Sequence, residues 1–581
     1  MDYKPLPIGI DDFKSLILND YYYVDKSLFI KELLDYKGMV NLFSRPRRFG
    51  KTLNLSMLRY FFEKTPEPSS ELFHGLAIMN EGNKYTSCMG KYPVISLSLK
   101  SGKQPSFDMA VESIKDEIIG EYNRHNDVVE SSKILENEKK RFKEIQNNEA
   151  TPVQFAKALK FLSDCLFKVY GEKVIILIDE YDVPLENAYF CGFYQEMIEF
   201  IRSLFESALK TNLSLEFAVI TGCLRISKES IFTGLNNLKI LSITDSRYSE
   251  HFGFTEYEVA QMLEYYRCSR QMATIKKWYD GYRFGFTDVF NPWSVLNYTD
   301  RYRADKDALP QPYWSNTSSN SIVKMLIEKA DMNAKQEIEE LIDGGSIIKL
   351  IHEDTLTSIP SWHGKNANKE EITYEDINKS QDNLWNFLFF TGYLKKVNEQ
   401  MLGDERYLTM AIPNTEVKTV YKSKILEWFK NKVEEKDLSN LYSALLAGDH
   451  EILEKQITIL LRESISFYDN AELFYHGFLI GVLGRLNDFI VDSNRESGDG
   501  RYDIKIRSLD VEKPVIILEL KVADCFMNME KCAAAALDQI SRMHYGEELI
   551  MDGYTSLICY GIAFYKKNCK VLKAEKELPY S

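Results

Sequence analysis

The chain has 581 residues, of which 45% are hydrophobic and 27% are charged, and its formal net charge at pH 7 is -14. Such a composition excludes a disordered or fibrous protein. The length exceeds what one hydrophobic core can serve, so at roughly 100 to 200 residues per domain we expect three or four domains. The negative charge excludes a protein whose whole surface binds nucleic acid, because neutralising phosphates requires clustered Lys and Arg. Any contact with nucleic acid must come from a local patch of Lys and Arg side chains.

The nine cysteines show no CxxC or Cys/His ligand spacing, which argues against a zinc site and favours reduced thiols in the cytoplasm. The first residues, MDYKPLPIGIDDFKSL, lack a basic start followed by an apolar run. No later segment has about 18 consecutive apolar residues, the length that a membrane span needs. We therefore expect a cytoplasmic protein that does not associate with membranes.

Four apolar runs in the first part of the chain predict strands: MVNLFS (39–44), YPVISLSL (92–99), KVIILIDE (173–180) and LEFAVITG (215–222). Amphipathic stretches separate them, a pattern typical of a parallel sheet flanked by helices. Between the second and third runs, residues 105–170 are rich in Glu, Lys and Phe at helical spacing, which predicts an all-helical insertion.

The character of the chain changes at Thr255, where TEYE matches a capping box and helical periodicity follows. We interpret this region as a helical lid that also contains the aromatic runs WYDGYRFG (278–285) and FNPWSVL (290–296). In the second run, Asn291 is the expected helix cap and Pro292 the first helical residue. We expect these aromatic side chains to pack within the protein rather than to contact a ligand.

Beyond the lid, the polar residues 362–383 predict an exposed connection or insertion. The apolar LWNFLFFTGYL then predicts a helix and RYLTMAI a strand, which loosely resembles a winged helix. A helical stretch from about 421 to 465 leads to a last region whose pattern is helix, paired strands, helix and strand.

The sequence RPRRFGKT (45–52) follows the first predicted strand and precedes the helical LNLSMLRYFFE, the context of a phosphate loop. Such a loop needs backbone N–H groups on the β-phosphate, a Lys on the β- and γ-phosphates and a Thr or Ser hydroxyl on Mg²⁺. Gly50, Lys51 and Thr52 supply the last three positions of GxxxxGK[ST]. A GKT tripeptide alone is common, so chance is the alternative interpretation.

The loop departs from that pattern at its first position, where Arg45 replaces Gly. A left-handed backbone there would cost about 1 to 2 kcal/mol for a non-Gly residue, so the loop either bends differently or is strained. Arg45, Arg47 and Arg48 also place three positive charges beside the expected phosphates, which favours an anionic ligand.

The strand KVIILIDE ends in Asp179 and Glu180, where a phosphate-loop ATPase needs one carboxylate for Mg²⁺ and a second to activate water. A buried strand explains VIILI but not two adjacent carboxylates. FAVITG brings Thr221 to the same edge of the sheet, where it can sense the γ-phosphate, although an ordinary Thr at a strand end fits equally well. Arg225, four residues later, is a candidate phosphate contact.

These motifs, with VDKSLFI, LIDEYDVP, TGCLRISKESIF, FGFTEYEV, WYDGYRFG and NPWSVL, resemble the bacterial AAA-ATPase-like family, which often carries a C-terminal nuclease-like domain. The resemblance covers roughly the first 300 residues. It implies nucleotide binding with ATP and Mg²⁺ as cofactors, Asp179 on Mg²⁺ and Glu180 as the base. The residues expected to bind the nucleotide or its metal are Arg45, Arg48, Phe49, Gly50, Lys51, Thr52, Asp179, Thr221 and Arg225.

In the run VIILELKV near the C-terminus, strand alternation places Glu519 and Lys521 on the same face as the inward-pointing Val515 and Ile517. The preceding RYDIKIR can pair with this strand as a hairpin and bring Asp503 next to Glu519. Two carboxylates can hold Mg²⁺, which polarises a phosphodiester. Lys521 can then position the attacking water and stabilise developing charge.

Two helices complete this set of candidates. Glu472, in AELFYHGFLIGVL, lies where a further metal-site carboxylate is expected, and His476, one turn later, is interpreted mainly as a packed residue. Gln539 lies in AAAALDQI, a small-residue helix that can pack close to the sheet. The alternative is an ordinary Glu519 to Lys521 salt bridge on an edge strand, worth only about 0 to 1 kcal/mol if exposed.

The order of Glu472, Asp503, Glu519 with Lys521, and Gln539 resembles the PD-(D/E)xK nuclease superfamily over residues 465–570. The resemblance implies metal binding by Asp503 and Glu519 and catalytic roles for all five residues. Tyr502 stands where that superfamily has Pro, a residue that shapes the backbone rather than binding metal.

We therefore predict an α/β multidomain protein: a phosphate-loop NTPase domain (1–250), a helical lid and winged-helix-like connector (251–435), and a PD-(D/E)xK nuclease-like α/β domain (436–581). The leading hypothesis is an ATPase that regulates a Mg²⁺-dependent nuclease acting on nucleic acid, with DNA as the expected form, and homo-oligomers are left open. The alternative is a nucleotide-operated switch whose nuclease-like domain only binds nucleic acid or a protein partner, which the missing first Gly and the acidic charge favour.

Overall fold

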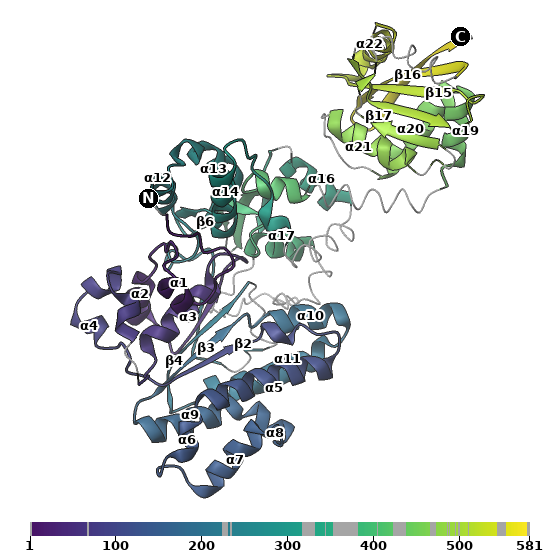
Figure 1. Ribbon diagram of the computed structural model, residues 1–581. Coiled ribbons are helices and arrows are strands. Elements are labelled where there is room, and N and C mark those ends of the chain that lie inside the picture. The colour runs from purple at the N-terminus through teal and green to yellow at the C-terminus, as the bar shows by residue number, and fades with distance from the viewer. Residues whose placement is uncertain are drawn as a thin grey trace. The chain divides into compact units, whose positions relative to one another are not determined.

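A computed structural model of the whole chain provides the structure (Figure 1). The residues that it describes are 3–66, 69–223, 231–232, 235–316, 332–342, 344–351, 381–403, 405–421, 437–464, 472–484, 486, 489–493, 496–497, 500–508, 510–542 and 554–577. They form two compact units, one made of residues 1–318 and 348–418 and the other of residues 319–347 and 419–581. This division does not test the predicted domain boundaries at residues 250 and 435, which stay predictions.

The first unit contains a five-stranded parallel sheet with the strand order β2-β3-β4-β1-β5. Its strands are β1 (Val40–Ser44), β2 (Val94–Ser98), β3 (Val174–Asp179), β4 (Leu215–Gly222) and β5 (Leu238–Leu241). The first four confirm the strands predicted from the apolar runs. β5 was not among the predicted strands, because it is short and mostly half-buried and so lacks a continuous apolar run.

Helices cover both faces of this sheet, because parallel strands need crossover connections and bury both faces. Figure 1 shows α3 (Lys51–Phe62) on one side, with α5, α9 and α11 (Tyr194–Leu209) on the other. The predicted all-helical insertion is confirmed as α5 (Phe107–Arg124), α6 (Asp127–Glu130), α7 (Glu136–Gln146), α8 (Pro152–Ala156) and α9 (Ala158–Tyr170). The remaining helices of this part are α1 (Phe13–Leu18), α2 (Leu28–Tyr36), α4 (Asn83–Thr86) and α10 (Val183–Cys191).

The lid region contains three helices and one hairpin: α12 (Glu256–Tyr265), α13 (Met272–Tyr279), the strands β6 (Tyr282–Phe284) and β7 (Thr287–Val289), and α14 (Pro292–Ala304). The predicted capping box is confirmed, since the Thr255 hydroxyl accepts from the Glu258 N–H and the Glu258 carboxylate accepts from the Thr255 N–H. Asn291 caps α14 as predicted, with its side-chain oxygen 3.0 Å from the Trp293 nitrogen. The run WYDGYRFG is not wholly helical, because its second half forms β6.

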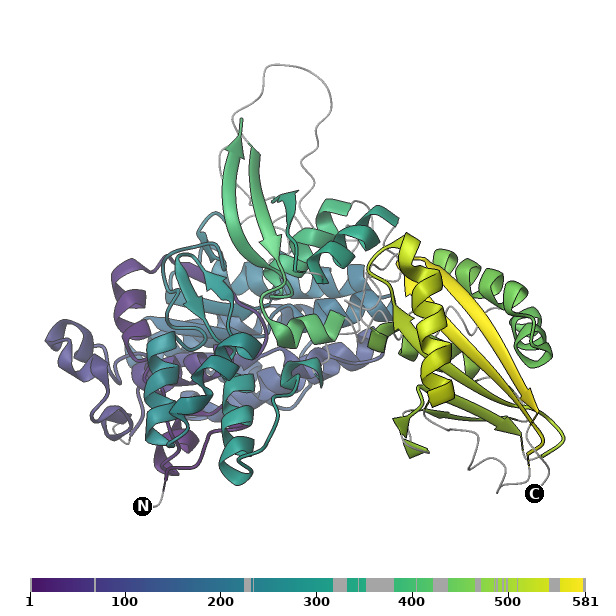
Figure 2. The ribbon, with the colours of Figure 1, turned by 90° about the horizontal axis from the view of Figure 1, so that it is seen from above.

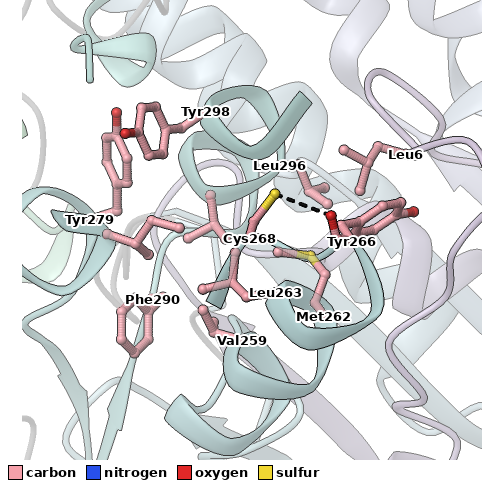
Figure 3. Packing of buried hydrophobic residues seen from close by; sticks show 12 residues of the cluster. Leu6, Val259, Met262, Leu263, Tyr266, Cys268, Tyr279, Phe290, Leu296 and Tyr298 are labelled. Atoms are coloured by element: carbon pink, nitrogen blue, oxygen red, sulfur yellow. Dashed lines mark hydrogen bonds between the residues drawn. The ribbon is translucent and has the colours of Figure 1, made fainter. Parts of the chain in front are cut away.

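A buried cluster joins the N-terminal segment to the lid helices (Figure 3). Leu6 lies at one end of the cluster, near Tyr266 and Leu296, while Tyr279 and Tyr298 lie at the other end. The Cys268 thiol donates a hydrogen bond to the Tyr266 carbonyl within this cluster. Tyr279 and Phe290 of the aromatic runs are buried in the cluster and Trp278 packs against it, which agrees with the interpretation that these side chains pack within the protein.

After the lid, a three-stranded sheet of order β8-β10-β9 follows, formed by β8 (Ile347–Leu350), β9 (Lys395–Leu402) and β10 (Glu405–Ala411). The predicted apolar helix is α17 (Gln381–Phe390), and RYLTMAI falls in β10 as predicted. β9 and β10 form the long green hairpin of Figure 2. The predicted connection at 362–383 lies mainly outside the described residues. The helical stretch expected from about 421 to 465 is confirmed in its described part by α19 (Ser439–Ala447) and α20 (His450–Ser464), and residues 422–436 lie outside it.

The second unit carries a mixed five-stranded sheet of order β11-β14-β15-β16-β17, in which only β15 and β16 are parallel. The strands are β11 (Phe489–Ser493), β14 (Ile504–Ser508), β15 (Val515–Val522), β16 (Ser556–Tyr565) and β17 (Asn568–Glu577), beside the two-stranded β12 (Glu496–Ser497) and β13 (Gly500–Arg501). The helices are α16 (Met332–Ile342), α19 (Ser439–Ala447), α20 (His450–Ser464), α21 (Glu472–Leu483) and α22 (Met529–Arg542). In Figure 2, α22 lies along the sheet.

No helix within the described ranges has both the length and the apolar character needed to cross a bilayer. All nine cysteines are free thiols.

Candidate nucleotide and nuclease sites

The segment 45–52 forms the connection between β1 and α3, as the phosphate-loop pattern predicts. Its left-handed residues are Arg48, with φ of 71°, and Gly50, with φ of 84°. Arg45 is not among them, so the missing first glycine causes no strain at that position. The loop therefore bends differently from the expected pattern, and the non-glycine strain falls on Arg48.

The Arg45 side chain is fully buried beneath the loop. Its guanidinium donates hydrogen bonds to the carbonyls of Ser44 and Leu241, at 2.9 and 2.8 Å, and lies 5.0 Å from the Phe252 ring and 5.3 Å from the Phe284 ring. Burial lowers the pKa of Arg45 to about 10, so it stays charged at neutral pH. Nucleotide binding by Arg45 stays a prediction, since the contacts of this side chain are those of a packed arginine that supports the loop.

Lys51 is buried at the start of α3, directly above the loop's own backbone. Its ammonium donates to the carbonyls of Arg45 and Pro46, each at 3.1 Å, and lies 3.3 Å from the Cys223 sulfur. Burial lowers the pKa of Lys51, but the Cys223 thiol and the nearby carboxylates outweigh that effect and leave the pKa above its ordinary value. A positive charge is therefore held at the mouth of the loop at neutral pH.

Asp179, Thr52 and Thr221 meet at the carboxyl end of the sheet. The Thr52 hydroxyl donates to one oxygen of Asp179 at 2.6 Å, and the Thr221 hydroxyl donates to the other. Burial raises the pKa of Asp179, against the opposing effect of these hydroxyl donors. This convergence follows from the strand order, because β4 lies between β1 and β3 and so places Thr221 between the loop and Asp179.

Glu180 follows Asp179 directly and adopts a left-handed backbone with φ of 51°. A non-glycine residue in this region costs of order 1 to 3 kcal/mol and is found most often at functional sites. Its N–H donates to the Asp179 carboxylate at 3.0 Å. Glu180 is half-buried and lies directly beside the buried Asp179 at the end of β3.

The lid contacts the phosphate loop through aromatic side chains. Phe49 is fully buried and lies edge-on to Tyr282, with ring centroids 4.9 Å apart, while the Arg48 guanidinium lies 4.1 Å from the Trp293 ring. Burial lowers the pKa of Arg48, and the nearby Glu180 opposes that change. Gly392 approaches so closely that a Cβ there would lie 3.0 Å from the Pro46 side chain. The loop is thus held between the sheet and the lid.

These residues fit a nucleotide with Mg²⁺, because a buried ammonium faces the loop while a hydroxyl and a carboxylate, both hard oxygen ligands, lie in contact. Arg225, the remaining predicted phosphate contact, lies outside the described residues.

The second candidate site lies on the C-terminal sheet. β14 and β15 form the predicted antiparallel pair, and the register of Ile504 with Leu518 sets Asp503 beside Glu519. The Asp503 carboxylate accepts a hydrogen bond of 2.7 Å from the Leu520 N–H. Burial raises the pKa of Asp503, although this N–H and the nearby His476 and Lys521 lower it.

Glu519 is only 2% exposed and faces α22, where the Gln539 amide donates to its carboxylate. The helix reaches this position because Gly561 pairs with Glu519 on the neighbouring strand. A Cβ at Gly561 would lie 2.2 Å from the Ala533 carbonyl oxygen, so only glycine permits this approach. The prediction that the small-residue helix packs close to the sheet is confirmed.

The structure describes the other predicted residues of this site in less detail. Lys521 is half-buried two residues beyond Glu519 on β15. Glu472 is the first residue of α21, but its side chain lies outside the described part of the structure. His476 is buried on the same helix and its ring nitrogen lies 3.0 Å from the Asp503 carbonyl, so it touches the backbone of the site. Tyr502 is buried in a hydrophobic cluster with Val515 and Ile517.

Within the described ranges, no three His, Cys, Asp or Glu side chains converge as a set that could hold a metal ion. Asp503, directly before β14, and Glu519, on β15, still offer two neighbouring carboxylates, which fits a hard cation that takes its remaining ligands from water or phosphate oxygens.

Sequence reasoning missed three features near these sites: the ion pair between Arg47 and Glu186, the Cys223 N–H donating to Asp182 at 2.8 Å, and the role of Gly561. Spacing in the sequence does not reveal the first two, because they join segments far apart in the chain. A glycine in the middle of a long apolar strand is a signal for close approach and could have indicated Gly561.

Comparisons with known proteins identify two regions of the chain. Residues 7–232 match the family model described as "Predicted AAA-ATPase", and residues 470–574 match the model of the PD-(D/E)XK nuclease superfamily. A protein of Azotobacter chroococcum mcd 1, described as "Uncharacterized protein in vnfD 5'region", is 26% identical over 565 residues, which cover 94% of each chain. This similarity extends across both domains. The chain therefore joins an AAA-ATPase-like domain to a PD-(D/E)XK nuclease superfamily domain.

Proposed function

We propose that the protein binds and hydrolyses ATP at the phosphate loop and that this reaction regulates Mg²⁺-dependent cleavage of nucleic acid, in the first place DNA, by the C-terminal domain. The contact of Thr52 and Thr221 with Asp179, beside the buried ammonium of Lys51, is the observation that carries the proposal. The adjacent carboxylates of Asp503 and Glu519 support the second half.

In the ATPase half, Lys51 and the N–H groups of the loop bind phosphate oxygens, and Thr52 and Asp179 hold Mg²⁺. The bound cation supplies charge neutralisation on the phosphates. Glu180 orients the attacking water and accepts its proton, which requires the carboxylate to be ionised. The Thr221 hydroxyl keeps Asp179 oriented and lies where the terminal phosphate can be sensed.

In the nuclease half, Asp503 and Glu519 would hold a divalent cation, which when bound would supply an activated water molecule and charge stabilisation on the phosphodiester. Gln539 fixes the orientation of Glu519, and the Leu520 N–H fixes Asp503. Lys521 stabilises the negative charge that develops on the phosphate. Glu472 serves as a further acidic residue of this site.

Nucleotide binding is tested by thermal unfolding with and without MgATP. The unaltered protein should melt at a higher temperature with MgATP, because a ligand that binds only the folded state stabilises it. Lys51→Ala should lose this shift, since the buried charge facing the phosphates is removed. Lys37→Ala, which loses a half-buried ion pair with Glu216, is the matched control and should keep it. An absent shift in the unaltered protein refutes nucleotide binding.

Cleavage is tested on single- and double-stranded DNA and RNA with Mg²⁺ or with EDTA. Cleavage should require the metal and should be abolished in Asp503→Ala and Glu519→Ala. Lys513→Ala, in the exposed turn between β14 and β15, is the control that should retain activity. Cleavage that persists in EDTA or in both variants refutes the nuclease.

The second candidate function is a nucleotide-operated switch whose C-terminal domain binds nucleic acid or a protein without cutting it. The net charge of -14 favours the form of this alternative in which the partner is a protein, because binding nucleic acid requires clustered positive charge. Metal-dependent binding without cleavage in the same assay would support it.

A further inference from the structure

Arg47, in the centre of the phosphate loop, forms an ion pair with Glu186 of α10. The two side chains are only 16% and 11% exposed. The other cations of the loop have different contacts, since Arg48 stacks on Trp293 and Lys51 binds backbone carbonyls. Arg47 thus directly links the loop to the helix that follows β3.

The position of Glu186 connects this ion pair to the chemistry of the site. α10 begins at Val183, three residues after Glu180, so it continues the strand that supplies both ATPase carboxylates. Burial raises the pKa of Glu186, and the nearby Asp182 adds to that effect, while Arg47 and Lys103 oppose it. If Arg47 moves away, Lys103 still lies near Glu186 as a second positive charge.

A phosphate bound at Lys51 would compete with Glu186 for Arg47, because the Cys223 thiol lies 3.3 Å from the Lys51 ammonium and also interacts electrostatically with Arg47. The terminal phosphate of a nucleoside triphosphate carries more negative charge than a carboxylate and accepts two parallel hydrogen bonds from a guanidinium. It also belongs on the side of Asp179 and Glu180, the side to which α10 is attached. A diphosphate places no group there.

We propose that Arg47 distinguishes a nucleoside triphosphate from a diphosphate by exchanging its partner Glu186 for the terminal phosphate. This inference rests on the nucleotide binding proposed above. The exchange releases Glu186, and therefore α10, when the triphosphate is bound, and it restores the ion pair once the terminal phosphate has left. Arg47 is thus a specificity-determining residue, and Glu186 is its internal competitor.

The experiment measures dissociation constants of a non-hydrolysable ATP analogue and of ADP by calorimetry on the full chain with Mg²⁺. Arg47→Ala should weaken the analogue about tenfold or more, the size expected for a lost charge-assisted hydrogen bond, and leave ADP nearly unchanged. Glu186→Gln should tighten the analogue, because the competing charge is removed. Lys37→Ala, outside the site, should change neither.

Arg47→Lys keeps the positive charge but cannot donate two parallel hydrogen bonds. It provides a second test in case the alanine variant does not fold. It should retain ADP binding and lose part of the preference for the analogue. Equal losses for both nucleotides in Arg47→Ala and Arg47→Lys, or weaker analogue binding in Glu186→Gln, would overturn the assignment of Arg47 while leaving nucleotide binding intact. If the unaltered chain binds neither nucleotide, both the inference and the proposed function fail.

Discussion

The two sites of this chain use buried carboxylates in different ways. Asp179 ends a parallel strand, receives two hydroxyl donors and lies near a lysine from another segment. Glu519 lies within a strand of a mixed sheet, receives an amide donor from a helix, and has its lysine two residues away on the same strand. A parallel sheet collects functional groups where its strands end, whereas the mixed sheet collects them on one face and depends on how closely a helix packs against it.

The two sites also differ in the contacts that fix them in place. The phosphate loop is fixed from two sides, by the sheet below and by Phe49, Tyr282 and Trp293 of the loop and lid. At the nuclease site, the helix that carries Gln539 can pack this closely against the sheet only because residue 561 is glycine. We therefore expect the first site to tolerate a single weakened contact and the second to fail abruptly.

The largest expected effect tests the roles of the two ATPase carboxylates. Glu180→Gln should bind ATP normally but lower its turnover about 100-fold or more, because the general base is lost. DNA cleavage in the absence of nucleotide should be unchanged. ATP turnover is measured by phosphate release, with Glu196→Gln, on the exposed face of α11, as the control. Unchanged turnover would show that Glu180 is not the base.

The next prediction tests the close packing of α22 against Gly561. Gly561→Ala should destabilise the C-terminal unit by about 3 kcal/mol, because overpacking against a backbone carbonyl cannot be relieved by a side-chain shift. Urea unfolding followed by circular dichroism measures the loss. Gly481→Ala, in α21 with nothing within 4 Å of the added Cβ, should instead be neutral or stabilising. Similar results for both variants would contradict the packing argument.

Glu416 is a buried carboxylate that differs from Asp179 and Glu519. Its hydrogen-bond donors are the Ser294 hydroxyl and the Trp314 N–H rather than a lysine. Burial raises the pKa of Glu416 from 4.5 to about 8. Its contribution to stability is therefore fully present below pH 4.5 and is lost as the pH rises through about 8.

Between pH 4.5 and about 8, the free energy of unfolding should fall by on the order of 1 kcal/mol per pH unit because Glu416 loses its proton. Glu416→Gln should abolish this fall. Chemical unfolding at several pH values measures the slope. Glu399→Gln provides the opposite case, since hydrogen bonding from Arg406 lowers the pKa of Glu399 and its stabilisation is lost only in acid. An unchanged slope in Glu416→Gln would show that this group does not titrate there.

The smallest expected effect concerns the support of the phosphate loop by the lid. Asn291→Ala should cost about 1 kcal/mol of stability through the lost cap of α14. It should also weaken nucleotide binding slightly, because α14 carries the ring that stacks on Arg48. Thr151→Ala removes a comparable cap from α8, in the helical insertion, and should leave nucleotide affinity unchanged. A larger effect on affinity for Thr151→Ala would break the proposed link between lid and loop.

Local patterns predicted much of the fold. Four of the five strands of the first sheet were found because buried parallel strands are continuous apolar runs, and both helix caps were found because their residues are adjacent in sequence. β5 and the hairpin at Tyr282 were missed, since neither contrasts with its surroundings in hydrophobicity. The burial of Arg45 was also missed, because its aromatic neighbours, Phe252 and Phe284, are more than 200 residues away in the sequence.

The burial of Phe49 against the lid has a consequence for how the protein unfolds. Removing the residues beyond 250 would expose Phe49 and deprive Arg45 of both aromatic rings. The phosphate loop would then be the first part of the sheet domain to lose its native conformation. The sheet, the lid and the strands up to residue 411 should accordingly melt in one cooperative transition, and an ATPase domain cut at residue 250 should not retain the nucleotide affinity of the full chain.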